Sequence, residues 1–203
     1  MEIRKSAGIL TTLALIAVAT RFLPHPPNAT AIGAFALFAG AYTRNSWSIF
    51  LVLIPMVISD MIIGFYSIKI LAVVYGSFLL IAIIGRLLQK NKSFENITLA
   101  AISGSVLFYL TTNYAVWMFG TLYPKTGNGL LASYLMALPF LGNMLLGDLV
   151  WSMAFIKGYE LLQKKIPILE HFKKKSAIGW SASGGKRSES VAVLQVAHYY
   201  EKQ

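Results

Sequence analysis

Long apolar runs are the feature that most constrains this chain. A helix needs about 20 predominantly apolar residues to cross a hydrocarbon core of roughly 30 Å. The sequence holds five such runs and a shorter one, which together predict an all-α, polytopic membrane helix bundle with about six transmembrane helices. In chain order the runs cover residues 6–23, 30–42 (the short one), 47–65, 68–88, 97–119 and 138–162.

The composition excludes an ordinary soluble domain. Hydrophobic residues make up 56% of the 203 residues and charged residues only 13%, about half of the roughly 25% that is usual in soluble proteins. A soluble core of this size could not hide so much apolar side chain, and the excess would form exposed patches. The chain has no cysteine, which excludes disulfides, thiolate metal sites and cysteine nucleophiles.

The formal net charge of +10 fits either a nucleic-acid-binding surface or the cytoplasmic rim of a membrane protein. The apolar runs favour the rim, so we expect a lipid bilayer and no nucleic acid among the partners. Cytoplasmic loops carry an excess of Lys and Arg, and the loops alternate in that sense when the N-terminus is placed inside. The inner segments then hold 4–5, 44, 86–92, 164–165 and 173–175, whereas the outer ones hold only Arg21, Lys69 and Lys125. Both termini are therefore predicted to be cytoplasmic.

Two boundaries are predicted near the C-terminus. Pro139 should separate a bent or independent start at 130–137 from the last span, because proline removes a helical hydrogen bond. Residues 166–203 are basic and rich in Ser, Gly and Lys, which is typical of a flexible cytoplasmic tail beside anionic lipid. The sequence thus predicts a transmembrane domain at 1–165 and a tail at 166–203.

Polar groups inside membrane spans are costly, and each is by default a candidate for function. In the predicted topology they gather in the outer half of the bundle, while the inner half is almost purely apolar. This asymmetry predicts an outward-facing polar pocket that is closed at its inner end, since a through-pore would carry polar residues along its length. The candidates in or beside the spans are Arg21, Asp60, Asn113, Trp117, Asn143 and Asp148.

Each candidate also has a structural interpretation. Arg21 fits a guanidinium that binds an anionic or carbonyl group of a ligand and equally one that extends to lipid headgroups. Asp60 fits a ligand contact or a buried partner of Arg21. Asp148 fits a hydrogen bond to Asn113 or a hydroxyl, or proton coupling. Asn113 and Asn143 also fit hydrogen bonds between helices, and Trp117 fits an interfacial anchor.

The segment after the first run has the sequence Arg21-Phe-Leu-Pro-His-Pro-Pro-Asn28. Its three prolines predict a rigid, extended path that holds His25 and Asn28 near the outer mouth, either as a polar lid or as a simple helix stop. The turn-rich segment 123–129 faces the same side, so Tyr123 is a further candidate. Small residues at Gly33, Ala36 and Gly40 predict close helix packing.

At these residues the chain resembles a family of uncharacterised bacterial membrane proteins. The proline segment carries most of the likeness, together with a small-residue span like 33–40. Weaker shared patterns are Thr112-Asn113 with Trp117, Tyr123-Pro124, and Asn143 through Gly147-Asp148.

More distantly, the layout is similar to the substrate-binding S component of energy-coupling-factor (ECF) vitamin transporters, which have six helices and a loop after the first one that covers an outward site. The resemblance implies capture of a vitamin-like small molecule. It further implies a partner module of a scaffold transmembrane subunit and two ATPase subunits. Many S components dock through an Ala-x-x-x-Ala motif in the first span, which this chain lacks, and Ala36-x-x-x-Gly40 is the nearest substitute.

Three functions follow as hypotheses. The first is a substrate-binding membrane subunit for uptake of a vitamin-like molecule, with no enzyme activity and no cofactor of its own. The second is an accessory or assembly subunit whose outer polar groups bind another protein. The third is a membrane enzyme that uses Asp60, Asp148 and His25 for acid–base chemistry, although the sequence has no nucleophile motif, no HExxH and no acidic metal cluster.

Overall fold

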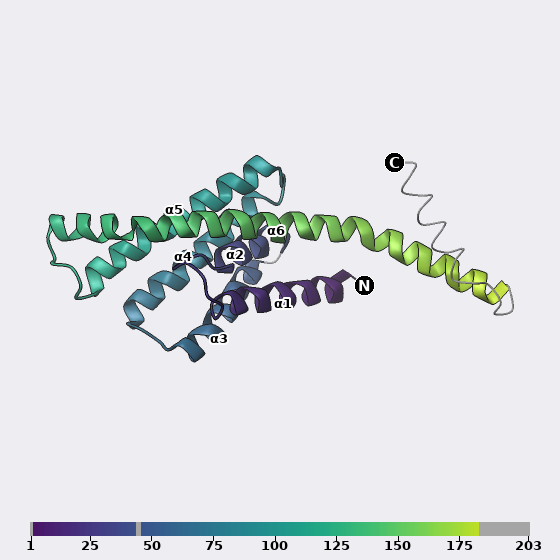
Figure 1. Cartoon of the computed structure of the whole chain (residues 1–203), viewed down its shortest axis with the longest axis horizontal. Coiled ribbons are helices and arrows are strands. Elements are labelled where there is room, and N and C mark those ends of the chain that lie inside the picture. Colours follow the sequence, from purple (N-terminus) through teal and green to yellow (C-terminus); the bar gives the residue numbers. More distant parts are fainter. Residues whose placement is uncertain (1, 44–45, 183–203) are drawn as a thin grey trace. The chain divides into compact units, whose positions relative to one another are not determined.

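The structure is a computed structural model that describes residues 2–43 and 46–182. Within these residues all regular structure is helical (Figure 1), which confirms the predicted all-α fold. The elements are α1 (Glu2–Thr20), α2 (Ile32–Tyr42), the 3₁₀ helix η1 (Ser46–Val52), α3 (Leu53–Ile63), α4 (Ile68–Leu87), α5 (Phe94–Phe119) and α6 (Gly127–Ala182).

Three of the helices are long and apolar enough to cross a membrane: α4, α5 and the Gly127–Lys164 part of α6. Three further apolar segments are shorter, namely Gly8–Thr20, Ile32–Tyr42 and Ile49–Ile63. Large apolar side chains are exposed along most of these elements; Ile62 of α3 and Leu146 of α6 are 68% and 67% exposed. Lengths, composition and exposed apolar faces together indicate a helical membrane protein.

The chain divides into two compact units, Met1–Gly158 and Tyr159–Gln203. In the second unit the helix continues to Ala182, and Gln163 Nε2 donates a hydrogen bond to Tyr159 Oη at 2.6 Å. Residues 166–182, within the tail that the sequence predicts from residue 166, are helical. Residues 183–203 lie outside the described part of the chain.

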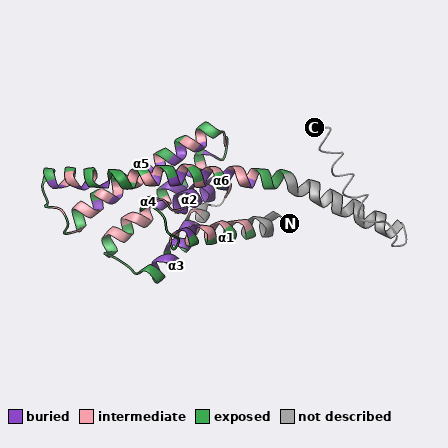
Figure 2. Ribbon diagram, viewed as in Figure 1, coloured by how far each residue is buried: buried purple, intermediate pink, exposed green. Residues whose placement is uncertain are grey.

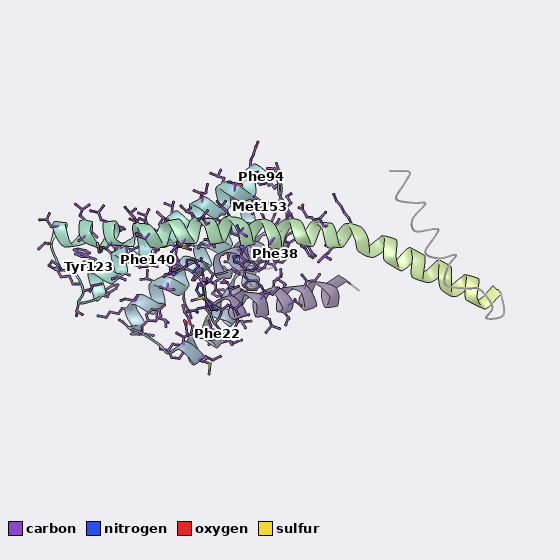
Figure 3. The ribbon with its side chains drawn as sticks, viewed as in Figure 1. Phe22, Phe38, Phe94, Tyr123, Phe140 and Met153 are labelled. Atoms are coloured by element: carbon purple, nitrogen blue, oxygen red, sulfur yellow. The ribbon has the colours of Figure 1, made fainter. Side chains whose placement is uncertain are left out.

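Helix α2 forms the core of the first unit. Every residue from Ile32 to Ala41 is buried, and Figure 2 shows this concentration of buried residues on α2. Phe38, labelled in Figure 3, is 1% exposed. Helix α2 contacts α1, η1, α4 and α5, so this short helix has protein on all its faces and the other elements form a shell around it.

Glycines allow α2 and α4 to cross with their backbones in contact. A Cβ on Gly40 would overlap the carbonyl oxygen of Ala82, and a Cβ on Gly85 would overlap that of Leu37. The predicted packing role of the small residues in 33–40 is therefore confirmed for Gly40. Because Ala36 is 0% exposed and Gly40 is covered by α4, the idea that Ala36-x-x-x-Gly40 docks onto a scaffold subunit is wrong.

Polar side chains from the α4–α5 connection and from α6 lie at the C-terminal end of α2. Gln89 Nε2 donates to the carbonyl oxygens of Gly40 and Thr43, both at 2.9 Å. The ammonium of Lys92 lies 4.8 Å from the ring centroid of Tyr42, within the range of a cation–π contact. Lys157 Nζ of α6 donates to the Lys92 carbonyl oxygen at 2.5 Å. The two Gln89 bonds thus supply donors to carbonyls at the end of α2, where the last carbonyls have no partner within the helix.

Pro139 does not interrupt α6, so the predicted boundary there is wrong. The helix runs without a break from Gly127. Two reciprocal hydrogen bonds hold its first turns against α5: Tyr109 Oη donates to the Tyr134 carbonyl oxygen at 2.8 Å, and Tyr134 Oη donates to that of Leu110 at 2.9 Å. Transmembrane helices tolerate proline where neighbouring helices support the segment, and these bonds supply that support just before Pro139.

Proline has a different effect in the third apolar run. Residues 46–52 are 3₁₀ and 53–63 are α-helical, with Pro55 in the first turn of α3. A proline is tolerated there because the first amide groups of a helix have no intrahelical acceptor. Gly64 then ends α3 with φ 108°, a conformation that favours glycine. The last turn of α3, which contains Asp60, thus ends directly at the connection to α4.

We predict that Gly85→Ala destabilises the protein by about 1–3 kcal/mol, because the added methyl group must push α4 away from the Leu37 carbonyl. Gly76→Ala in the same helix is the matched control, since a Cβ there meets nothing within 4 Å, and alanine favours a helix over glycine by up to about 1 kcal/mol. Reversible unfolding in detergent measures both. Equal effects of the two substitutions would contradict the close α2–α4 crossing.

Candidate functional site: a cavity at the start of α2

The first unit contains a cavity of about 560 Å³. Residues from three connections line it: the one after α1, the one between α3 and α4, and the one between α5 and α6. Helices α2 to α6 supply the rest of the wall. The polar lining consists of Arg21, His25, Asn28, Thr30, Tyr66, Tyr109, Thr112, Asn113 and Tyr123.

The structure brings together five of the nine residues singled out from the sequence. These five lie on α5 and on two connections that are far apart along the chain, and they are Arg21, His25, Asn28, Asn113 and Tyr123. The other four, Asp60, Trp117, Asn143 and Asp148, do not line the cavity. The polar groups of the predicted outer half therefore divide between the cavity wall and the contacts that support it.

The side chain of Thr20 links the two ends of the connection from α1 to α2. The Thr20 hydroxyl donates to the Ala17 carbonyl oxygen at 2.8 Å and accepts from the amide of Ala31 at 3.1 Å. Both ends of the proline segment are thereby held together by one side chain that is 7% exposed. The segment forms a closed loop on the cavity.

Within this loop the chain turns and does not remain extended. The Ala29 amide donates to the Pro26 carbonyl oxygen at 3.0 Å, which closes a four-residue turn with Pro27 second and Asn28 third. Asn28 has φ 68°, and a positive φ at the third position defines a type II turn, where proline second and Asn or Gly third are favoured. The extended path predicted from the prolines is therefore corrected to a tight turn that holds Asn28 at the cavity. His25 Nδ1 lies 2.6 Å from the Leu23 carbonyl oxygen.

Arg21 forms a buried ion pair with Asp60. Its Nη1 lies 2.7 Å from Asp60 Oδ1, and the two side chains are 19% and 1% exposed. The same nitrogen donates to Ser59 Oγ at 2.6 Å. Of the two interpretations open for Asp60, the structure shows the partner of Arg21. Since Arg21 also lines the cavity, the ion pair lies at the cavity wall.

Asp60 has a second partner that the sequence did not indicate. Tyr75 Oη of α4 donates to Asp60 Oδ2 at 2.8 Å. The carboxylate thus links the end of α1, through Arg21, to α3 and α4. This arrangement satisfies the charge in a region surrounded by apolar side chains, where an unpaired carboxylate would be costly.

Asn113 and Tyr66 present neutral polar groups to the cavity. Asn113 Nδ2 donates to the Tyr109 carbonyl oxygen at 2.8 Å, and among the described residues no group donates to its Oδ1. The side-chain amide therefore offers an acceptor. Burial raises the pKa of Tyr66, in the α3–α4 connection, to about 12, and the nearby charge of Asp60 adds to the effect. Its phenol is protonated at neutral pH and can donate a hydrogen bond.

Trp117 supports the cavity indirectly. Its Nε1 donates to the Pro124 carbonyl oxygen at 3.0 Å, and Lys125 Nζ donates to the carbonyl oxygens of Trp117 and Gly120. An ammonium at the C-terminal end of α5 is favourable for the helix dipole. These bonds fix the α5–α6 connection and so position Tyr123, which lies with Phe140 at that end of the bundle in Figure 3.

The two α6 candidates have different surroundings. Asn143 is half-buried and its neighbour Met144, not Asn143 itself, faces the cavity. Asp148 is 3% exposed, and its Oδ2 lies at hydrogen-bond distance, 2.8 Å, from Ser105 Oγ. The structure thus shows a hydroxyl as the partner of Asp148, which was one of the two structural interpretations from sequence.

Most of the cavity wall was missed because it is apolar. Aromatic rings and methionines cover the space between the polar groups, and in a chain this apolar their sequence signal is the same as that of lipid-facing residues. Phe78 and Phe108 form part of this wall with ring centroids 5.0 Å apart. The missed apolar and aromatic residues include Met56, Tyr66, Phe78, Phe108, Tyr109, Met136, Phe140 and Met144.

The wall combines apolar surface with a few polar groups. Over residues 2–43 and 46–182, wherever side chains are described, no three His, Cys, Asp or Glu side chains lie close enough to hold a metal ion. The guanidinium at the wall is paired with Asp60, and the other polar side chains are an imidazole, amides, hydroxyls and phenols. The cavity can therefore hold an apolar or aromatic body and bind a few polar atoms at its edge.

The fold and the cavity define a helical membrane protein with a small-molecule-sized site among its helices. The chain belongs to DUF6580, a family of unknown function, whose members it matches over residues 1–169. No curated protein and no solved structure matches it.

We predict that removing one partner of the Arg21–Asp60 pair destabilises the fold by about 3 kcal/mol or more, because the other charge is left buried without its counterion. Arg21→Met and Asp60→Asn test this singly by unfolding in detergent. The double variant should lose less than the sum of the single losses, since neither charge remains. Strict additivity would show that the pair contributes no coupling energy.

Proposed function

We propose that this protein is a substrate-binding membrane subunit that takes up a vitamin-like small molecule through its cavity. The observation that carries the proposal is the convergence of Arg21, His25, Asn28, Asn113 and Tyr123 on one space. These residues come from α5 and from two separate connections, and the pattern of polar groups in the apolar runs anticipates their convergence.

The size and lining of the cavity support a small-molecule ligand. Ligand sites typically measure about 300–1,000 Å³ and combine mostly apolar and aromatic walls with a few convergent polar groups. The cavity measures about 560 Å³ and has that composition. Its six aromatic residues favour a ligand with a flat, unsaturated body.

The ion pair refines the chemistry of the ligand. Arg21 alone would favour an anionic or a carbonyl group. Because Asp60 neutralises the guanidinium at 2.7 Å, the wall has no net charge from this pair. We therefore favour a neutral molecule with carbonyl acceptors, which Arg21 and the Tyr66 phenol can bind, and a donor group for Asn113 Oδ1.

The proposal includes six spans, cytoplasmic termini and a cavity that opens outward from a bacterial inner membrane. Two groups of contacts support this orientation. The three connections predicted to be outside all line the cavity at the start of α2. Gln89 and Lys92, predicted to be inside, lie at the other end of α2. Lys157 of the last span reaches the same end.

Energy for uptake would come from other chains, because this sequence contains no nucleotide-binding motif. The similarity to S components implies a scaffold subunit and two ATPase subunits as partners. With Ala36 and Gly40 buried, a scaffold would have to contact an exposed helix. Helix α1 offers such a face, since Leu15 is 61% exposed.

The orientation is testable because the natural chain has no cysteine. We expect Thr121→Cys, in the α5–α6 connection, to react with a membrane-impermeant maleimide on intact cells. Asn91→Cys, in the α4–α5 connection, should react only after permeabilisation. Both positions are exposed, so access is set by the membrane. The reverse pattern would place the cavity on the cytoplasmic side.

A thermal-shift screen of the purified protein against vitamins and neutral cofactor precursors tests binding directly. A ligand at 100 times its dissociation constant should stabilise the fold by about 2.7 kcal/mol. We expect Asn113→Ala to lose this shift and Asn143→Ala to keep it. The two substitutions remove the same amide, but only Asn113 lines the cavity.

Absence of any stabilising compound, with cooperative unfolding of the sample, would contradict the uptake proposal and favour the accessory-subunit hypothesis. Equal loss in both Asn variants would place the ligand outside the cavity. Arg21 is a poorer choice for this screen, because its substitution also removes the counterion of Asp60.

A further inference from the structure

Asp148 is a buried carboxyl group that the proposed function does not use. It lies in the middle of the apolar part of α6 and is 3% exposed. Its side chain packs on α2 at Gly33, where a Cβ would overlap Asp148 Oδ1 and lie 2.9 Å from Oδ2. A side chain at residue 33 would displace this carboxyl group from its present position, so α2 and α6 touch through it.

The hydrogen bonds of Ser105 bear on the protonation state of Asp148. Ser105 Oγ lies 3.1 Å from the Ala101 carbonyl oxygen and 2.8 Å from Asp148 Oδ2. A serine hydroxyl has one hydrogen to donate and two lone pairs that accept. If Asp148 were ionised, the one hydroxyl hydrogen of Ser105 would be divided between two acceptors, the Ala101 carbonyl oxygen and Asp148 Oδ2. If Asp148 is the neutral acid, its O–H donates to Ser105 Oγ, and Ser105 donates to Ala101, so both contacts are full hydrogen bonds.

No cation in the described part of the chain is placed to balance an ionised Asp148. Helix α2 carries no charged residue, and its titratable Tyr42 lies at the far end, 3.5 Å from the Ile156 carbonyl oxygen. On α5 the nearest titratable group is Tyr109, which donates to Tyr134. Lys157 of α6 is nine residues away and binds the Lys92 carbonyl oxygen.

The carboxyl group lies about one helical turn from the cavity along α6. Met144, one helical turn before Asp148 on α6, lines the cavity, as does Ile32, which precedes Gly33 on α2. The charged pair of the cavity wall, Arg21 with Asp60, belongs to α3 and the end of α1. Asp148 thus lies apart from the Arg21–Asp60 pair, where α2, α5 and α6 meet.

We propose that Asp148 is a proton-binding site beneath the cavity, held as the neutral acid by donating its O–H to Ser105 Oγ while α2 and α6 are in contact. Loss of the proton leaves a carboxylate against the backbone of Gly33, without a counterion, and weakens the α2–α6 contact. The protein therefore carries one exchangeable proton, and the strength of the α2–α6 contact depends on it. This inference does not depend on the identity, or the existence, of a ligand for the cavity.

The composition allows a direct test, because the chain has only two aspartates, Asp60 and Asp148. Protein labelled with aspartate bearing ¹³C at the side-chain carboxyl carbon is placed in lipid bilayers at pH 7. The infrared difference spectrum against unlabelled protein then reports these two groups. We expect one carbonyl band of a protonated acid and one carboxylate band. Asp148→Asn should abolish the acid band and Asp60→Asn the carboxylate band.

Ser105→Ala provides a check that leaves both aspartates in place. The acid band should remain but shift in frequency, since the hydroxyl that accepts its hydrogen bond is gone, whereas the carboxylate band should not move. If either aspartate variant fails to fold, the wild-type and Ser105→Ala spectra still decide the point. Two carboxylate bands and no acid band at pH 7 would overturn the proposal, as would an acid band unaffected by Ser105→Ala. A carboxylate band that responds to Na⁺ would indicate a cation site in its place.

Stability provides the functional readout. The folded protein holds a proton that the unfolded chain, with an ordinary carboxyl group, releases above about pH 4. Stability must therefore fall as pH rises through the range in which the acid band disappears. We expect this fall in wild-type protein and not in Asp148→Asn, whose neutral amide imitates the acid. A parallel fall in both proteins would show that the α2–α6 contact does not respond to this proton.

Discussion

The complete burial of α2 is the constraint on which the rest of the structure depends. A helix surrounded by protein must approach its neighbours closely, and a helix of Ala, Gly and a few large apolar residues allows this. Gly40 and Gly85 allow the backbones of α2 and α4 to touch, and the carboxyl group of Asp148 from α6 packs against Gly33. The cavity at the start of α2 exists because the surrounding helices are fixed at its other end by this crossing and by Gln89.

The two aspartates show two ways of keeping a carboxyl group inside an apolar bundle. Asp60 has a guanidinium and a phenol as partners, and it links three elements beside the cavity. Asp148 has a single hydroxyl partner and a glycine for space. The first arrangement stabilises a charge, whereas the second suits a neutral acid. The difference follows from the neighbours that each helix presents and could not be read from either residue alone.

Much of the helical content follows from the length of the apolar runs, because the thickness of a bilayer fixes how long such runs must be. The wrong boundary at Pro139 came from the rule that proline interrupts a helix. In this bundle the hydrogen bonds donated by Tyr109 and Tyr134 hold the preceding turns of α6 against α5. Polarity within spans predicted that Arg21 and Asn113 line one pocket. It could not predict that Asn143 and Trp117 turn away, since helix rotation depends on packing. Nor could it find Phe78 or Met144, because cavity-facing and lipid-facing apolar residues are chemically alike.

The closed loop after α1 has a consequence for how tightly any molecule can be held. Three prolines, the turn at Asn28 and the hydrogen bonds of Thr20 order this loop when the chain folds. Ordering a flexible backbone costs roughly 1–2 kcal/mol per residue, and here that cost falls on folding and not on association. An occupant of the cavity would meet this part of the wall already ordered, so more of its interaction energy would remain as affinity.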